Sequence, residues 1–120
     1  MDIRLDHDSA VPPYEQVRLR IADLAATGAL TAGTRLPPVR HLATDLGLAA
    51  NTVARAYREL EKAGLVETRG RLGTIITARA ARVPIEAQQA ASRYAEQSRS
   101  LGITPETALD LVRAALELPG

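Results

Sequence analysis

The sequence predicts a mostly α-helical fold with a small β hairpin. Three observations lead to this prediction. Two short amphipathic segments meet at Gly47, two short apolar runs enclose a basic turn at residues 69–72, and helical patterns fill most of residues 85–118. Hydrophobic periodicity and turn residues are the main sequence signals of such elements. Together they predict an N-terminal winged helix-turn-helix followed by a C-terminal two-helix tail.

The chain opens with a short strand pattern and continues into a first helix. Ile3 and Leu5 alternate with charged residues, which is the period of a strand. A helix is expected from about Pro13 to Thr27, because proline is tolerated in a first helical turn. Its expected buried stripe is Tyr14, Val17, Ile21 and Leu24. Residues 35–36 are expected to form a second short strand.

The helix-turn-helix is predicted from residue 39 to residue 63. Its first helix starts after Pro37-Pro38 and ends at Gly47, since glycine accepts the left-handed conformation of many helix ends. The second helix, residues 50–63, is expected to bury Val53, Ala56, Tyr57 and Leu60. The helical period then turns the polar residues outward: Asn51, Thr52, Arg55 and Arg58.

A basic hairpin follows, with strands expected at residues 65–68 and 73–76. Residues 35–82 hold nine Lys or Arg and four Asp or Glu, a net charge of +5, whereas the rest of the chain carries −4. A helix fits the DNA major groove, and a local basic region is what phosphate binding requires. The alternative is two packed helices and a surface hairpin without a role in nucleic-acid binding.

Short motifs between residues 36 and 74 carry a family resemblance. They are Leu36-Pro37, Arg40, Leu42-Ala43, Leu46-Gly47, Asn51-Thr52-Val53, Arg55-Ala56-Tyr57, Glu59-Leu60, Gly64-Leu65-Val66 and Gly73-Thr74. These residues resemble the winged-helix domain of the GntR family of bacterial transcription regulators, and the run NTVARAY is similar to its YtrA branch. The resemblance covers residues 3–77. It departs at Ala50 and Ala54, where many members carry arginine, so these two contacts are not carried over.

The expected DNA-binding set combines the resemblance with the outward pattern of the second helix. It comprises Arg40, Asn51, Thr52, Arg55, Arg58, Arg69, Gly70 and Arg71. Asparagine suits adenine, and arginine suits guanine or phosphate. Helix 50–63 and the wing, residues 67–75, are therefore predicted to bind double-stranded DNA, with Arg55 as the foremost contact.

Residues 78–120 predict a helical hairpin after a short basic connector at 78–82. One helix is expected from Ile85 to Leu101, and the last helix starts with Thr104 as its N-cap. That helix is apolar on more than one face, so a second subunit is the simplest cover, and packing on its own winged domain is the alternative. The resemblance implies that this tail is a dimerisation unit. The expected dimer contacts are Tyr94, Leu101, Leu109, Val112 and Leu116.

The sequence shows no constellation for catalysis, for a cofactor or for a metal ion. There is no cysteine, and His7 and His41 lie far apart without ligand spacing. No signal peptide and no apolar run of the ~20 residues that cross a membrane is present. We therefore expect no enzyme activity, no cofactor, no membrane partner and a cytoplasmic location.

Together with these patterns, the resemblance implies a homodimeric transcription regulator, acting as a repressor, that reads an inverted-repeat operator. DNA binding is assigned to residues 1–77 and dimerisation to residues 78–120. The alternative function is a winged-helix protein-interaction module that does not bind DNA. The sequence leaves open whether a small-molecule effector binds at the dimer interface, because no group of residues indicates which ligand would bind there.

Overall fold

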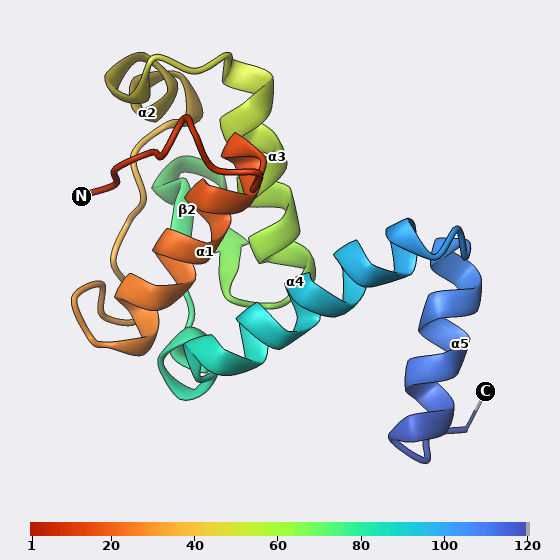
Figure 1. The fold of residues 1–120 in the computed structure, drawn as a ribbon. Coiled ribbons are helices and arrows are strands. Elements are labelled where there is room, and N and C mark those ends of the chain that lie inside the picture. Colours follow the sequence, from red (N-terminus) through yellow and green to blue (C-terminus); the bar gives the residue numbers. More distant parts are fainter. Residues whose placement is uncertain (120) are drawn as a thin grey trace. The chain divides into compact units, whose positions relative to one another are not determined.

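The structure is a computed structural model that describes residues 1–119. The chain forms two compact units, Met1–Ile85 and Glu86–Gly120. Its elements are α1 (Pro13–Ala26), α2 (Val39–Leu46), α3 (Ala50–Lys62), β1 (Val66–Thr68), β2 (Thr74–Ile76), α4 (Ile85–Ser100) and α5 (Pro105–Ala115), with 3-10 turns η1 (Gly70–Leu72) and η2 (Ala78–Arg82) (Figure 1). The predicted class, mostly helical with a small β wing, is confirmed.

The core of the first unit is built around α3, against which both α1 and α2 pack (Figure 1). The four residues predicted to face the core from α3 are all buried. In α1 the buried row runs through Val17, Ile21 and Ala25. These residues are four positions apart, which rotates Tyr14 and Leu24 off the row and leaves both only half-buried. The predicted stripe of α1 was wrong at these two positions.

The turn between α2 and α3 depends on Gly47, as predicted. Its φ of +66° and ψ of 33° are left-handed helical values, which glycine adopts without a Cβ clash. Its backbone N–H donates to carbonyls in the last turn of α2, and this closes the helix. Leu48 then packs against the core and brings the chain to the start of α3.

The wing is an antiparallel pair in which β1 and β2 align Val66 with Ile76 and Thr68 with Thr74. Residues 34–36 run beside β2, where the Leu36 N–H donates to the Thr74 carbonyl at 2.8 Å. The predicted strand at residues 35–36 is therefore only an isolated bridge. The predicted strand at Ile3 was wrong: residues 1–6 are irregular, because the segment anchors itself by burying the Ile3 side chain instead of pairing its backbone.

The connector after β2 folds onto the first unit as η2. The Thr77 hydroxyl donates to the Gly64 carbonyl at 2.7 Å, and its oxygen also accepts from the Ala80 N–H. Ala80 is buried, and η2 packs against α1. The first compact unit therefore extends through residues 78–85. The assignment of DNA binding to residues 1–77 and of dimerisation to the rest stays a prediction.

The second unit is a helical hairpin whose two helices meet around Ala108. The Tyr94 hydroxyl on α4 donates to the Ala108 carbonyl on α5 at 2.8 Å. Thr104 caps α5 as predicted, since its Oγ1 accepts from the Thr107 N–H at 3.1 Å. Large apolar side chains stay more than half exposed in this single chain: Leu101, Leu109, Leu111, Leu116 and Leu118. The tail therefore presents apolar surface that an isolated chain leaves in water.

Candidate nucleic-acid interface

The outward face of α3 carries the residues that the sequence predicted for it. Asn51, Arg55 and Arg58 are exposed, and Thr52 is half-buried. They face outward because the opposite face of α3 is locked into the core, where Val53 and Ala56 are fully buried. The first two turns of α3 thus present amide, hydroxyl and guanidinium groups, which are the side-chain groups that contact base edges and phosphates.

On the flank that faces α1, Arg55 lies over the ring of Tyr14. The guanidinium carbon is 3.7 Å from the ring centroid, a close cation–π contact. Pro13, Tyr14, Asn51, Thr52 and Arg55 line one hollow of about 290 Å³. Sequence reasoning missed Tyr14 by assigning it to the core of α1. The signal that could have found it is an aromatic residue in the first turn of a helix in an arginine-rich domain.

On the opposite flank, the wing and the start of α2 approach α3. The Thr68 hydroxyl on β1 donates to Glu61 Oε2 at 2.8 Å, which ties the wing to the last turns of α3. Val39, Arg58 and Thr68 are among the residues around a hollow of about 210 Å³ there. The next residue of α2, Arg40, is exposed. The structure therefore surrounds the outward face of α3 with α1 on one side and with α2 and the wing on the other.

At the wing tip, the two predicted arginines differ in their surroundings. Arg69 forms an ion pair with Glu67 on β1. Arg71 is exposed, and no residue within 1–119 pairs with it. Between them Gly70 has a φ of +49°, and no atom lies within 4 Å of the position where a Cβ would stand. The charge of Arg69 is thus largely neutralised inside the wing, whereas that of Arg71 is available to a partner.

The acidic side chains of this region are mostly engaged within the protein. Glu59 lies 3.9 Å from Lys62, Glu61 accepts from the wing, and Glu67 pairs with Arg69. By contrast, four predicted contacts form no ion pair with any described residue: Arg40, Arg55, Arg58 and Arg71. The surface around α3 therefore keeps its positive charge, which is suited to a polyanion.

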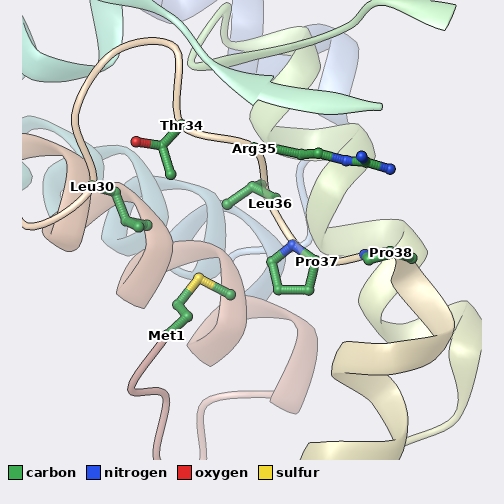
Figure 2. A pocket seen from close by; sticks show the side chains of 7 residues that line it. All are labelled: Met1, Leu30, Thr34, Arg35, Leu36, Pro37 and Pro38. Carbon is green, nitrogen blue, oxygen red and sulfur yellow. The ribbon is translucent and has the colours of Figure 1, made fainter. Parts of the chain in front are cut away.

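Another hollow, of about 410 Å³, lies beside the segment that leads into α2. Figure 2 shows the side chains of Met1, Leu30, Thr34 and Leu36 turned toward one another, while Arg35 extends away from them. None of its lining residues belongs to the predicted DNA-binding set. This hollow is therefore separate from the candidate interface.

Within residues 1–119, no three His, Cys, Asp or Glu side chains gather closely enough to hold a metal ion. No helix there is both long enough and apolar enough to cross a bilayer.

The model of the family described as "Bacterial regulatory proteins, gntR family" matches residues 13–76, which run from the start of α1 to the end of β2. The matched segment thus contains the outward face of α3, both flanks and the wing.

Two curated relatives and one solved structure extend this similarity. The transcriptional regulator Rv1152 of Mycobacterium tuberculosis is 49% identical over 107 residues, which cover 89% of this chain and 88% of the relative. The transcriptional repressor YtrA of Bacillus subtilis is 42% identical over 85 residues, 70% of this chain and 65% of the relative. YtrA from Sulfolobus acidocaldarius superposes with a TM-score of 0.62 at 27% identity, over 80% of this chain and 97% of that one. All three are transcription factors, not enzymes.

Proposed function

The chain belongs to the gntR family of bacterial regulatory proteins and is a transcription regulator with a DNA-binding domain, and we propose that it acts as a homodimeric repressor. In this proposal, α3 enters the major groove of an operator, with the wing reaching the neighbouring groove or its phosphates. Two copies of the chain read the two halves of an inverted repeat, whose spacing follows from the dimer.

The observation that carries DNA binding is a set of exposed arginines on α2, α3 and the wing that form no ion pair with any described residue. Arg40, Arg58 and Arg71 come from α2, α3 and the wing, and all three are exposed. Such cations supply the salt-dependent part of DNA affinity by displacing counterions from phosphates. Asn51 and Thr52 in the first turn of α3 supply the groups that distinguish base pairs.

The apolar surface of the second unit supports the homodimer. Leu109 on α5 and Leu116, the C-cap residue of that helix, lie about two turns apart and are 52% and 63% exposed, with the half-buried Val112 between them. A stripe of this kind on a monomer favours association with another apolar surface. The matching stripe of a second copy gives the self-complementary contact that two-fold symmetry requires. We extend repression to this chain from the name of its relative, the repressor YtrA of Bacillus subtilis.

The experiment that tests the proposal has two parts. Sedimentation of the full chain gives the oligomeric state, and selection of bound fragments from genomic DNA gives the operator. We expect a dimer that enriches one inverted repeat, and a reporter gene placed behind that repeat should be expressed less when the protein is present. Increased expression would remove the repressor assignment and leave DNA binding intact.

The competing function, a protein-interaction module, predicts a different salt response. Phosphate contacts release counterions, so the affinity for DNA should fall steeply as salt rises. A dimer that binds neither genomic fragments nor random duplexes at low salt would contradict the DNA-binding proposal. The exposed face of α3 would then have to serve a protein partner.

A further inference from the structure

Tyr14 and Arg55 form a contact that the core of the domain does not require. Tyr14 is half-buried at the start of α1, and Arg55 is exposed on α3. With the guanidinium carbon 3.7 Å from the ring centroid, the cation lies directly over the ring. Arginine carries five N–H donors, more than one ring can engage, so donors remain to bind an acceptor.

A hollow beside Tyr14 and Arg55 offers space for such a hydrogen-bond acceptor. The hollow of about 290 Å³ is bounded by Pro13 and Tyr14 from α1 and by Asn51, Thr52 and Arg55 from α3. Among these five residues Arg55 is the only charged one, and no carboxylate of residues 1–119 forms an ion pair with it. The hollow therefore combines a fixed positive charge with amide and hydroxyl groups, a set that fits an anion with several oxygen atoms.

We propose that Tyr14 is a positioning residue that holds Arg55 for a backbone phosphate of the bound DNA, and that this phosphate occupies the hollow. The inference rests on the proposed DNA-binding function and assigns one part of that interface. It also separates two roles on α3. Arg55 contacts the backbone and fixes the register of the helix, while Asn51 contacts a base edge.

The position of the contact favours a phosphate over a base. Tyr14 draws Arg55 toward the flank of α3 that faces α1, and the flank of a helix lying in the major groove faces the sugar–phosphate wall. The ring also limits the conformations of a long side chain before DNA arrives. A side chain that is already ordered loses less conformational entropy on binding, so the stacked arginine binds more tightly than a free one.

The test uses the full chain, a fluorescent duplex of random sequence and a range of salt concentrations. Arg55→Ala should weaken binding and reduce the slope of log affinity against log salt by about 1. Tyr14→Leu should weaken binding roughly two- to tenfold. Tyr14→Phe keeps the ring and should match the wild type. In the Arg55→Ala background, Tyr14→Leu should have no further effect, because the two residues act as one unit.

Arg20→Ala is the matched control, since it removes the same charge from α1 at a residue that pairs with Asp23 and does not line the hollow. Its salt slope should equal that of the wild type. A second measurement needs no variant. The Arg55 Nε–H resonance, shifted by the tyrosine ring, should move when the random duplex is added. A resonance that stays in place would overturn the proposal, even if Tyr14→Leu failed to fold.

The remaining outcomes separate the positioning role from the wider function. If Arg55→Ala weakens binding but Tyr14→Leu does not, Tyr14 does not position Arg55. If Arg55→Ala leaves the salt slope of binding to the random duplex unchanged, Arg55 does not contact a phosphate and the phosphate assignment is wrong. A wild-type protein without salt-dependent binding to any duplex would remove the DNA-binding function itself.

Discussion

The hydroxyl of Tyr57 donates a 2.7 Å hydrogen bond to the carbonyl of Pro37, twenty residues earlier in the chain. The bond joins the buried side of α3 to the segment that starts α2. Because Tyr57 is only 7% exposed, its hydroxyl depends on this partner for hydrogen bonding. The two helices of the helix-turn-helix are thus held together by a polar contact in addition to their apolar packing.

Tyr57→Phe tests that bond and its dependence on pH. Loss of the hydroxyl should lower the free energy of unfolding by about 1 kcal/mol at neutral pH. Burial raises the pKa of Tyr57 from 10.0 to about 12. The unfolded chain therefore ionises this phenol from about pH 10 and the folded chain only near pH 12, so about 2–3 kcal/mol of stability is lost as pH rises from 10 to 12. Denaturant unfolding across this range should show that decline in the wild type and a smaller one in Tyr57→Phe.

Gly73→Ala should destabilise the wing more than Gly70→Ala. Gly73 has a φ of +77° and a ψ of −151°, a region open essentially to glycine alone, where alanine costs about 1–3 kcal/mol. Its added Cβ would also stand 3.0 Å from Arg35 Nε, whereas the space at Gly70 is open. Thermal unfolding and hydrogen exchange of the wing amides measure the difference. Adding Arg35→Ala to Gly73→Ala should not restore stability, because the backbone strain of alanine at position 73 remains.

Arg40→Ala should weaken operator binding by roughly 1–3 kcal/mol without unfolding the domain. The residue is exposed on α2 and forms no ion pair with the described residues, so nothing in the fold depends on its charge. Fluorescence anisotropy with the selected operator measures the loss. Arg4→Ala, which removes an exposed arginine outside the basic region, is the control and should bind as the wild type does. Equal affinities for the two variants would remove Arg40 from the interface.

Glu67→Gln should strengthen DNA binding. Glu67 neutralises Arg69 in the folded wing, and its amide would release that guanidinium to the phosphates. The slope of affinity against salt should become steeper for Glu67→Gln and shallower by about 1 for Arg71→Ala. Glu96→Gln in the tail makes the same charge change away from the wing and should leave the slope unaltered. An unchanged slope for Glu67→Gln would mean that Arg69 does not reach DNA.

The double variant Leu109→Ser/Leu116→Ser should be monomeric at concentrations where the wild type is a dimer. Both side chains are more than half exposed, so serine costs the isolated chain little. Leu111→Ser is the matched control, because Leu111 is 53% exposed on another face of α5. Sedimentation gives the oligomeric state of each. Dissociation by Leu111→Ser alone would move the interface to that other face.

Much of the first unit could be predicted from local pattern. Gly47 was recognised as the helix end because glycine readily adopts the left-handed conformation of a helix end, and the buried face of α3 followed from the helical period. The prediction of a strand at Ile3 was wrong, because an alternation of apolar residues does not by itself provide a second strand to pair with. The prediction that the Tyr14 side chain is buried was wrong. Helical periodicity alone allows more than one apolar stripe to be drawn on α1, and the stripe that packs against the neighbouring helix leaves Tyr14 half-buried.

The sequence by itself determined the family, the helix-turn-helix and the location of the positive charge, since each depends on residue types and on spacing within a single element. Only the tertiary structure decided which cations are available. It placed Arg55 over the ring of Tyr14, from a different helix, and left Arg71 without an ion-pair partner among residues 1–119. The physical reason is distance. Coulomb and cation–π energies act over a few ångströms, and residues from α1, α3 and the wing come within that range only when the core has packed.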